Sequence, residues 1–523
     1  MYGYAAILLF SLAAVVVAYK LADSYIDRLP DHRGFHLVPV ENEVRVKPLL
    51  TPARTVLVVV DGLREDRARG MRSAQRLAEL GQCRSTYSGP LTISRPVYAV
   101  ISTGLEQDRT GSRNNDDISP VAVQSIWGVA RDAGLQVHGA SNLEWWRQLF
   151  PGAFTSYRFD LDETQNFFVL EELGELSLIH PVRVDTAGHN HGADSDQYRQ
   201  ATAATDRELS ALIDGLDFSK DLLIFTADHG HTGRGGHGSP NPEVAHVLTC
   251  LAGPSIQQAK SEHQIDSRTI GPTIAVLLGL PFPKHMRAGD DGLDQIWSMV
   301  RSDVLGAEYV EERKASIEHF RSENAIYLGK VLGHPTGRWT ELYAEGTRRH
   351  QLLWLLVGLA LLGMTVALSR LRRQSPKDAA LSVLWMVSGL LLSCGLYTLV
   401  RGSFDFDSIN KRQEFLDASI GVSMAVAVVA AGLHIALWRD LKRLLFDHGT
   451  LLLSMVVVSL AQPCIYGITL GFPLPGRIPI FLPFILGALV ICGGILAGLF
   501  ALLLLLRSSG LFRKVLGPQG AAP

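Results

Sequence analysis

Charged residues are scarce in this chain, and neither sign of charge is in surplus. Only 19% of the 523 positions are Asp, Glu, Lys or Arg, against roughly 25% in an average soluble domain. The 49 basic and 51 acidic residues nearly cancel, whereas a protein whose main partner is nucleic acid carries a basic surplus for the phosphates. The composition therefore argues against an ordinary soluble chain, and no nucleic-acid partner is expected.

Cysteine is also rare, with five residues in the whole chain. A disulfide scaffold is excluded, because such scaffolds are short and dense in cysteine. Cys394, Cys464 and Cys492 lie in strongly apolar runs, which leaves Cys83 and Cys250 elsewhere. Their spacing fits no zinc ribbon or redox motif, so the pattern favours inert buried thiols and leaves one disulfide open.

Several common signatures are missing as well. The sequence contains no Gly-rich phosphate loop and no dinucleotide fingerprint, which removes the usual nucleotide-binding folds. It also has no internal repeat and no low-complexity tract. What the chain does have is a large share of apolar residues, 47% of all positions, and these are gathered at its two ends.

The apolar runs predict an integral membrane protein with six spans. Residues 4–19 come close to the roughly 20 apolar residues that a helix needs to cross a bilayer, so we expect an uncleaved anchor over residues 1–22, with a cleaved signal peptide as the alternative. Packing the C-terminal runs inside a soluble protein would need a shell of amphipathic helices, which this third of the chain lacks. An all-α membrane domain is expected over residues 351–507, with spans at 352–368, 379–400, 416–438, 451–472 and 478–506.

Basic residues between the spans predict their orientation, since cytoplasmic loops are enriched in Lys and Arg. The loops after the second and fourth spans are rich in basic residues, and so is the start of the tail at residues 508–523. Both termini are therefore expected in the cytoplasm. The long segment between the first and second spans would then be extracytoplasmic, in the periplasm or the lumen of the endoplasmic reticulum.

This middle segment has the pattern of an α/β domain. Residues 56–60 and 222–226 are short apolar runs typical of buried parallel strands, and residues 244–251 resemble another strand. Residues 119–133 and 197–216 have helical patterns. We expect a linker at 23–50, a metal-dependent phosphotransfer domain at 51–300 and a charged helical linker at 301–350.

Four short stretches of the domain are rich in groups that bind metals, at residues 60–64, 185–191, 228–231 and 235–238. The first and third follow directly after predicted strands, at the edge where open α/β sheets bind ligands. Mixed His and carboxylate ligands suit Zn²⁺ or Mn²⁺ better than Mg²⁺ or Ca²⁺. Each stretch alone is commonplace, but together they offer ligands for two metals about 4 Å apart, an arrangement that catalyses phosphoryl transfer.

A further stretch, residues 89–96, supplies candidate nucleophiles. Thr92 and Ser94 offer hydroxyl groups, and Arg95 offers a guanidinium. The residues that follow look like a helix that ends near Gly104. A hydroxyl at a helix N-terminus lies where the dipole favours an anionic phosphate, although Ser or Thr at such a position can also simply cap the helix.

Taken in order, these motifs resemble the alkaline phosphatase superfamily, and within it the nucleotide pyrophosphatase/phosphodiesterase branch that includes GPI ethanolamine phosphate transferases. The resemblance extends over roughly residues 50–290 and implies an alkaline-phosphatase-like α/β fold. The matching residues are Asp61-Gly62-Leu63-Arg64-Glu65-Asp66, Thr92-Ile93-Ser94-Arg95-Pro96, Thr103-Gly104, Asp185 with Gly188-His189, Asp228-His229-Gly230 and Gly236-His237-Gly238.

The resemblance also implies two divalent metals, Zn²⁺ before Mn²⁺, each with three protein ligands. The two expected ligand sets are Asp185, His189 and His237 for one metal, and Asp61, Asp228 and His229 for the other. Thr92 is expected on the second of these metals as the nucleophile, in preference to Ser94. Asn115 stands where the branch places an Asn that donates to a phosphate oxygen, and Arg95 could orient the substrate.

The sequence departs from the transferase pattern around the expected metals without removing a ligand. Ile93 stands where an acidic residue is common, and Val97-Tyr98 replaces the usual Gly-His. His231 stands where Met is usual, and Gly233-Arg234 where Asp-Trp is usual. His231 and also His191 could orient the substrate or support the ligands.

The function implied is that of a membrane-bound transferase. It would move phosphoethanolamine or a similar phospho-alcohol from a phospholipid donor to an extracytoplasmic glycolipid or lipid acceptor, through a phospho-Thr92 intermediate. The alternative is a membrane-tethered phosphodiesterase or phosphatase that uses water as the acceptor; a transporter or scaffold with an inactive domain is disfavoured by the intact ligands. Five C-terminal spans favour transfer between lipids, because an enzyme acting on soluble substrates needs only one anchor. The sequence predicts no oligomeric state.

Overall fold

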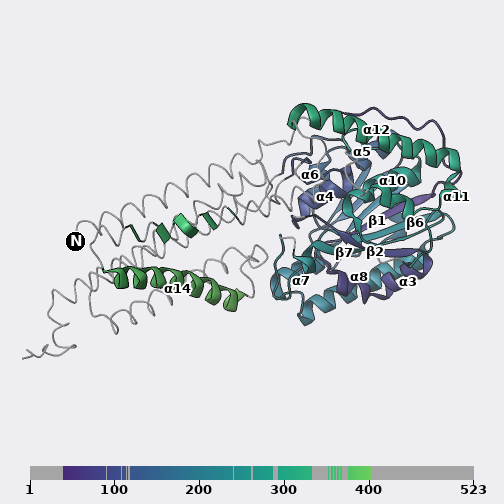
Figure 1. Cartoon of the computed structure of the whole chain (residues 1–523). Helices are drawn as coiled ribbons and strands as arrows, with labels where there is room; N and C mark the ends of the chain where they lie inside the picture. The colour runs from purple at the N-terminus through teal and green to yellow at the C-terminus, as the bar shows by residue number, and fades with distance from the viewer. Residues whose placement is uncertain are drawn as a thin grey trace, which may run out of the picture.

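The computed structural model describes residues 39–332 except 90, 108, 113–114, 116–117, 239–240, 261–262 and 287–292, then scattered positions between 352 and 367, and residues 375–401. The first of these ranges forms a mixed α/β domain around a single eight-stranded sheet (Figure 1). The predicted α/β fold is thereby confirmed.

The sheet has the strand order β4-β3-β5-β1-β6-β7-β2-β8. Strand β7 runs antiparallel to both of its neighbours, and all other neighbouring strands are parallel. As a result, β1, β2, β5 and β6 all end at the same edge. The strand bounds are β1 Arg54–Val60, β2 Gln82–Tyr87, β3 Val137–Ser141, β4 Ser156–Phe159, β5 Leu176–His180, β6 Asp221–Ala227, β7 His246–Ala252 and β8 Ile265–Asp266.

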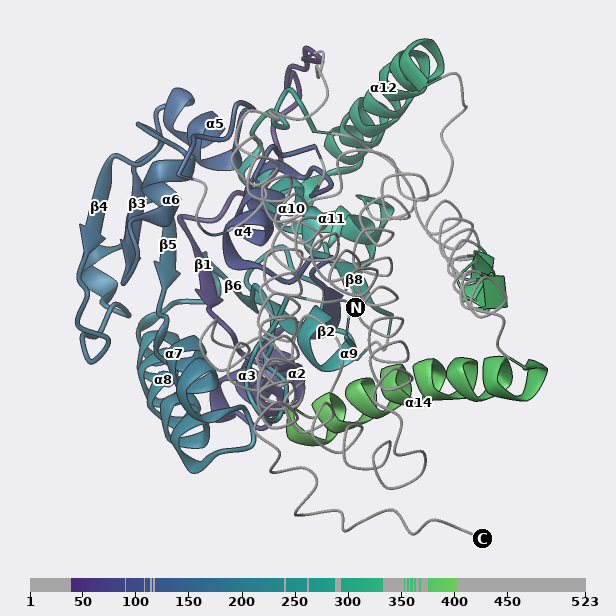
Figure 2. The same cartoon turned by 90° about the vertical axis from the view of Figure 1, so that its left-hand side faces the viewer.

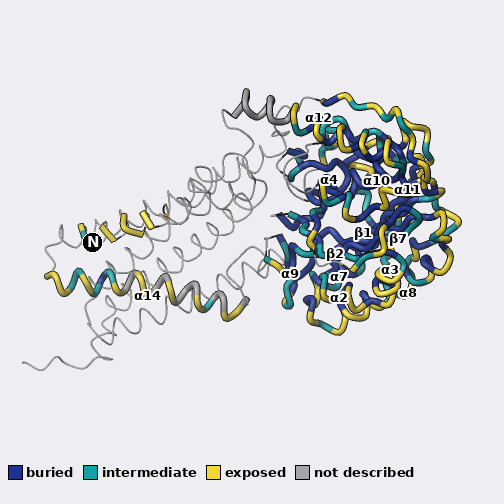
Figure 3. Tube along the Cα trace, turned by 45° about the vertical axis from the view of Figure 1, so that its right-hand side comes forward, coloured by how far each residue is buried: buried dark blue, intermediate teal, exposed yellow. Residues whose placement is uncertain are grey.

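The central strand β1 is buried on both faces, which explains its unbroken apolar sequence. Leu57 and Val59 pack into one hydrophobic core, whereas Val56, Val58 and Val60 pack into the other. Figure 3 shows this buried centre flanked by helices with exposed outer faces. The parallel pairing of β1 with β6 agrees with the strands predicted at 56–60 and 222–226.

Helices cover both faces of the sheet (Figures 1 and 2). One face carries α4 Ser94–Thr103, α5 Ile126–Asp132, α6 Trp145–Leu149, α10 Ile270–Leu278 and α12 Ala307–Leu332, and the other carries α2 Glu65–Arg69, α3 Arg72–Leu80, α7 Arg183–His191 and α8 Asp196–Gly215. Shorter elements are α9 Pro242–Ala245, α11 Ser302–Leu305 and the 3₁₀ turns Leu170–Glu172, Ser267–Thr269 and Leu293–Ser298.

Two predicted elements begin later than expected. The helix predicted at 119–133 begins at Ile126, because Ser125 caps it by accepting a hydrogen bond from the Gly128 N–H. The strand predicted at 244–251 begins at His246, because the short helix α9 occupies the preceding residues. The helix predicted at 197–216 is α8, shifted by one residue.

The apolar core continues past residue 300 into α12. Tyr309, Val310, Ile317 and Phe320 of this helix are buried in the core that contains α4 and α10. The first half of α12 is therefore packed against the domain, whereas the sequence suggests a surface linker.

The membrane part of the prediction lies largely outside the described residues. Helix α14, Pro376–Arg401, coincides with the span expected at 379–400. Residues 4–19, 416–438, 451–472 and 478–506 are outside the described part, and 352–368 is described only at scattered positions. Among the residues that are described, no helix is both long and apolar enough to cross a membrane. The six spans stay a prediction.

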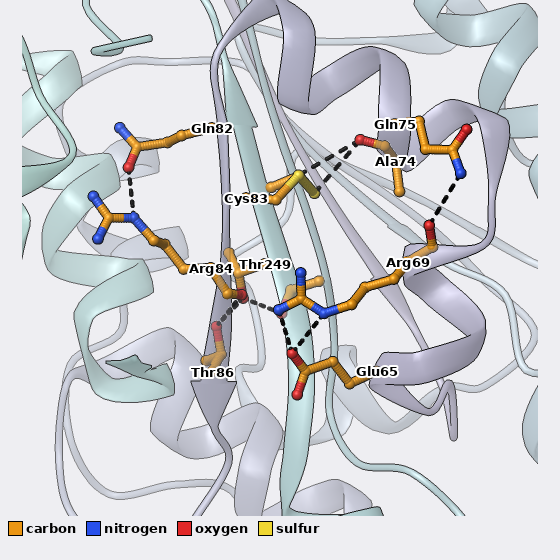
Figure 4. Close-up of a disulfide and its surroundings, with 11 residues drawn as sticks. Glu65, Arg69, Ala74, Gln75, Gln82, Cys83, Arg84, Thr86 and Thr249 are labelled. Atoms are coloured by element: carbon orange, nitrogen blue, oxygen red, sulfur yellow. Dashed lines mark hydrogen bonds and ion pairs between the residues drawn. A yellow bond between two sulfur atoms is a disulfide. The ribbon is translucent and has the colours of Figure 1, made fainter. Parts of the chain in front are cut away.

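A disulfide joins Cys83 to Cys250 (Figure 4). The two residues lie directly opposite each other on the antiparallel strands β2 and β7, although 167 positions separate them in the sequence. The interpretation as free thiols is wrong for this pair, and the alternative of one disulfide is correct. The pairing is set by strand register, which cysteine spacing does not reveal.

Candidate active site

Segments from across the chain meet at the edge where the parallel strands end. Asp61 directly follows β1, and Asp228 and His229 directly follow β6. Helix α7, which follows β5, carries Asp185 and His189. The loop between β6 and α9 adds His237, and the loop between β2 and α4 adds Thr92. The seven residues expected to act as metal ligands or nucleophile thus lie at one edge of the sheet.

Asp61, Asp228 and His229 form the first ligand cluster. The backbone N–H groups of Gly62 and His229 donate to Asp228 Oδ1 at 3.0 and 2.9 Å. Asp61 Oδ1 and Asp228 Oδ2 are buried and have no hydrogen-bond partner within the described part of the chain. These two oxygens lie 3.5 and 3.2 Å from His229 Nε2. A buried carboxylate oxygen without a donor is costly, so a cation fits between these three atoms.

The spacing of these atoms suits zinc. Ligand atoms at about 2.0–2.1 Å from a tetrahedral zinc ion are about 3.3 Å apart. His229 Nδ1 lies 3.1 Å from the carbonyl oxygen of Gly230, so this nitrogen carries the ring proton and Nε2 presents its lone pair. The residues present therefore fit a divalent metal.

Asp185, His189 and His237 form a second cluster beside the first. The two Nε2 atoms of His189 and His237 face each other at 3.1 Å, and Asp185 Oδ2 lies 3.5 Å from His189 Nε2. His237 Nδ1 donates to the carbonyl oxygen of Thr92 at 2.6 Å, which leaves its Nε2 free of a proton. Asp185 and His237 also belong, with His229 and His231, to a group of four side chains whose ligand atoms all lie within 4.8 Å of one another. His189 joins this group through its contacts with Asp185 and His237.

His231 lies within reach of the same carboxylate, but its hydrogen bonds differ. Its Nδ1 accepts from the Gly236 N–H at 3.1 Å, so in the neutral ring the proton is on Nε2. That proton points to Asp185 Oδ1, 2.7 Å away. His231 is therefore arranged to hold Asp185 in place and not to bind a metal through Nε2. Gly188 makes room for the ring, because a Cβ there would lie 2.4 Å from it.

Burial and mutual repulsion shift the pKa values of the carboxyl groups. Burial, with help from the charge of Asp61, raises the pKa of Asp185 to about 6 and raises the pKa of Asp228 well above its usual value. Burial acts in the same direction on Asp61, but the interaction with His180, above all its hydrogen bond, outweighs burial and holds the pKa of Asp61 below the usual value. Such a crowded set of carboxyl groups favours a divalent cation among them.

Burial also favours the neutral form of His229 and His237. It lowers the pKa of His229, and it lowers the pKa of His237 well below its usual value with help from the neighbouring rings. Neutral imidazole is the form that binds metals.

The loop with the candidate nucleophile is fixed from both sides. Thr92 is fully buried, and its Oγ1 accepts from the Gly238 N–H at 2.7 Å. Leu91, which precedes Thr92, is held by the side chain of Gln107. The Leu91 N–H donates to Gln107 Oε1, and Gln107 Nε2 donates to the Leu91 carbonyl oxygen. Ser94 Oγ lies 3.2 Å from His229 Nε2. Ser94 thus contacts the first cluster, and Thr92 contacts the loop that carries His237 of the second.

The remaining predicted residues lie near the clusters but face in different directions. Asn115 Oδ1 accepts from the Arg95 N–H at 3.0 Å, so its side chain lies at the N-terminus of α4. The guanidinium of Arg95 is buried over the ring of Trp145 and bonded to Gln148, both of which belong to α6. His191 is exposed at the end of α7. The contacts of Arg95 indicate a packing role for its side chain.

Sequence reasoning missed two buried residues that touch the first cluster. Tyr98 donates to Asp61 Oδ2 at 2.5 Å, and His180 lies 3.4 Å from the same oxygen. The sequence did flag Tyr98 as a departure from the usual Gly-His. It offered no signal for His180, which is the last residue of the mostly apolar strand β5.

Part of the chain matches a known protein family. Residues 131–234 match the family described as type I phosphodiesterase / nucleotide pyrophosphatase. That range contains Asp185, His189, Asp228 and His229.

Among curated proteins, the similar sequences are GPI ethanolamine phosphate transferases. The catalytic subunit of transferase 3 from Mus musculus is 28% identical over 274 residues, which cover 44% of this chain and 25% of that protein. The catalytic subunit of transferase 2 from Homo sapiens is 22% identical over 316 residues, 54% of this chain and 30% of that protein. The chain thus matches only a quarter to a third of the length of these relatives.

Among solved structures, murine ectonucleotide pyrophosphatase/phosphodiesterase 5 has 13% identity and a TM-score of 0.35, covering 44% of this chain and 96% of that chain. A mutant of the alkaline phosphatase PafA has 13% identity and a TM-score of 0.38, covering 47% and 98%. The sequence matches confirm what the motifs predicted: the chain resembles the type I phosphodiesterase/nucleotide pyrophosphatase family and its GPI ethanolamine phosphate transferases.

Proposed function

We propose that this chain is a membrane-bound, metal-dependent phosphotransferase that moves phosphoethanolamine, or a similar phospho-alcohol, from a phospholipid to another lipid or glycolipid. The observation that carries the proposal is the pair of buried, donor-free carboxylate oxygens, Asp61 Oδ1 and Asp228 Oδ2, that converge on His229 Nε2. This is a site built for a cation beside a buried threonine. The two relatives described above are named as transferases of this kind, and they supply the substrate class.

Two divalent metals would be held by the residues of the two clusters. Asp61, Asp228 and His229 would bind one metal, and Asp185, His189 and His237 would bind the other. When bound, such metals lower the pKa of a hydroxyl nucleophile and neutralise charge that develops on the phosphate. Zn²⁺ agrees best with the mixed His and Asp donors, and Mn²⁺ is the second choice.

Thr92 is the proposed nucleophile. Its hydroxyl loses its proton, and the oxygen attacks the phosphorus of the donor lipid. The bond from phosphorus to the oxygen on the lipid side breaks, and the lipid leaves as an alcohol that takes up a proton. This leaves the phospho-alcohol on Thr92. The hydroxyl of an acceptor then attacks the same phosphorus and frees the threonine, which regains its proton.

The protein holds the reacting groups in place through backbone contacts. His237 donates to the carbonyl oxygen of Thr92, and the Gly238 N–H donates to its hydroxyl oxygen. A loop that carries a proposed metal ligand therefore also fixes the nucleophile. Asn115 Oδ1 accepts from the Arg95 N–H at the N-terminus of α4, and the side-chain NH₂ group of Asn115 can donate to a phosphate oxygen.

Two further observations support a location outside the cytoplasm and next to a membrane. Disulfides persist in oxidising compartments and are rare in the cytosol, and Cys83 is bonded to Cys250. Arg234, in the loop between His231 and His237, donates to the carbonyl oxygen of Val400 near the end of α14. If α14 is the predicted span, the active-site loop lies close to lipid.

The proposal can be tested by purifying the full chain in detergent with Zn²⁺ and adding phosphatidylethanolamine labelled in its head group, together with a total lipid extract. Transfer predicts that label appears on a second lipid and that chelation abolishes it. Label released only as free phosphoethanolamine would instead support the hydrolase. No release of any kind from zinc-loaded protein would overturn the proposed substrate class.

A further inference from the structure

Tyr98 occupies a position that the proposed mechanism does not use. It is fully buried on α4, and its ring stacks on Trp146 with centroids 4.3 Å apart and meets His180 edge-on at 4.9 Å. Its hydroxyl lies 2.5 Å from Asp61 Oδ2. A residue that departs from the transferase pattern thus contacts a proposed metal ligand directly.

The hydroxyl is one member of a chain of buried hydrogen bonds that begins on β3. Ser141 Oγ accepts from the Leu143 N–H at 2.9 Å and lies 2.8 Å from His180 Nδ1. His180 Nε2 lies 2.8 Å from the Tyr98 hydroxyl. The chain therefore runs through Ser141, His180 and Tyr98 to Asp61.

The direction of each hydrogen bond follows from the end at Asp61. An ionised carboxylate can only accept, so Tyr98 donates its proton to Asp61 Oδ2. The Tyr98 oxygen then accepts from His180 Nε2–H, which leaves His180 Nδ1 without a proton to accept from Ser141 O–H. Burial and the charge of Asp61 raise the pKa of Tyr98 well above its usual value, so the hydroxyl keeps its proton.

We propose that Tyr98 is a positioning residue that orients the Asp61 carboxylate so that Oδ2 is engaged and Oδ1 alone faces the metal, with His180 and Ser141 fixing the Tyr98 hydroxyl. The inference rests on the proposed function, because it assumes a metal at Asp61, Asp228 and His229. Two facts carry it: Oδ2 is bonded to Tyr98, and Oδ1 of the same carboxylate has no donor within the described part of the chain.

The consequence is a difference in metal affinity between the two clusters. Loss of an outer hydrogen-bond partner typically weakens metal binding by about 10–100-fold. Tyr98→Phe removes the hydroxyl and keeps the ring that stacks on Trp146. It should weaken binding at the Asp61 cluster by that factor and leave the Asp185 cluster unchanged, because His231 and not Tyr98 holds Asp185.

The test is a Zn²⁺ titration of the metal-free full chain against a chelator of known affinity, which gives the two binding constants separately from activity. Tyr309→Phe is the matched control, since its buried hydroxyl donates to the carbonyl oxygen of Val276 at 2.6 Å, away from both clusters. It should lose one buried hydrogen bond and no zinc affinity. Ser141→Ala, which removes the far end of the chain, should weaken the same site by a smaller factor and serves if Tyr98→Phe does not fold.

The outcomes separate the inference from the proposed function. One outcome would overturn the positioning role alone. In it, the wild type binds two zinc ions, and the Tyr98→Phe or Ser141→Ala variant binds both with the affinities of Tyr309→Phe. Wild-type protein that binds no zinc would overturn the proposed metal centre, and the inference with it. A selective loss at one site in Tyr98→Phe supports both.

Discussion

Two hydroxyl groups of one motif lie beside the two ligand clusters, and only one of them can be the nucleophile. Thr92 has its oxygen bonded to the Gly238 N–H and its carbonyl bonded to His237, whereas Ser94 faces His229. We expect Thr92→Ala to lose about 10³-fold or more of the transfer rate. Ser94→Ala should lose about tenfold at most, as for a residue that only supports a ligand. Trapping of phosphothreonine by mass spectrometry provides a direct check, and the opposite ranking of the two variants would move the nucleophile to Ser94.

The raised pKa of Asp185 predicts how zinc binding depends on pH. A carboxyl group must lose its proton to bind a metal, and in the metal-free protein burial and Asp61 raise the pKa of Asp185 to about 6. Below that pH zinc must displace a proton, so its affinity for this cluster should fall about tenfold per pH unit, whereas above it the affinity no longer changes because of Asp185. His237 adds no proton in this window, because its pKa is well below its usual value.

The measurement is chelator competition between pH 5 and pH 8, with Asp185→Asn showing which of the two zinc affinities belongs to this cluster. An affinity that stays flat from pH 5 to pH 7 in the wild type would contradict the assignment of Asp185 as a ligand.

At the residue scale, the sequence reveals ligands but not their supporting partners. Asp61, Asp228 and His229 could be predicted because they directly follow apolar strand patterns. Tyr98 and His180 could not, because their roles depend on a contact between α4 and β5, which are 82 residues apart. The distinction between His189 and His231 also required the structure, since it depends on which ring nitrogen accepts the Gly236 N–H.

At the element scale, Gly62 allows the end of β1 to approach α7. It has a φ of +71°, and a Cβ there would lie 2.7 Å from the Asp185 Cα. Gly134 is the matched control, because it has a φ of +90° and no atom lies within 4 Å of the position that a Cβ would take. Gly134→Ala should therefore cost only the strain of a positive φ, about 1–2 kcal/mol. We expect Gly62→Ala to lower the free energy of unfolding by more than that control and to weaken zinc binding at the Asp185 cluster. Thermal unfolding and zinc titration of both variants test this, and equal effects would show that α7 does not need the close approach.

Strands β2 and β7, which flank the loops of the site, are joined covalently. Removal of a native disulfide typically costs about 2–5 kcal/mol, and the bond between Cys83 and Cys250 closes a loop with a sequence separation of 167. The double variant Cys83→Ser/Cys250→Ser should therefore unfold at a lower temperature than the wild type. A reductant should lower the unfolding temperature of the wild type and leave the variant unchanged. A wild type that does not respond to reductant at all would argue against a stabilising bond.

The elements themselves were predictable where burial imposes a pattern. Residues 56–60 of β1 and 222–225 of β6 are apolar because both faces of the sheet are covered, and α8 shows the helical period. The start of α5 was not predictable from periodicity, because Ser125 and not an apolar residue sets it. The packing of α12 was hidden because its charged outer face dominates its composition.

At the scale of the whole molecule, bound metal should add to stability. Each site at about 1,000 times its dissociation constant contributes about 4 kcal/mol, and a domain of this size responds by about 2–4 °C per kcal/mol. Removing both metals with a chelator should thus lower the unfolding temperature by about 15–30 °C, and added Zn²⁺ should restore it. A variant lacking ligands in both clusters, Asp228→Asn/Asp185→Asn, should not respond. Identical unfolding with and without chelator would count against structural coupling of the metals to the fold.

The order of strands in the sheet has a consequence for how the chain is made. Strand β1 is synthesised early, but its two neighbours in the sheet, β5 and β6, begin only at Leu176 and Asp221. At about 5–20 residues per second of synthesis, β1 waits roughly 6–24 s with both edges unpaired until β5 is made. An apolar strand with free edges is an aggregation hazard, so the nascent chain is expected to need a chaperone during this interval.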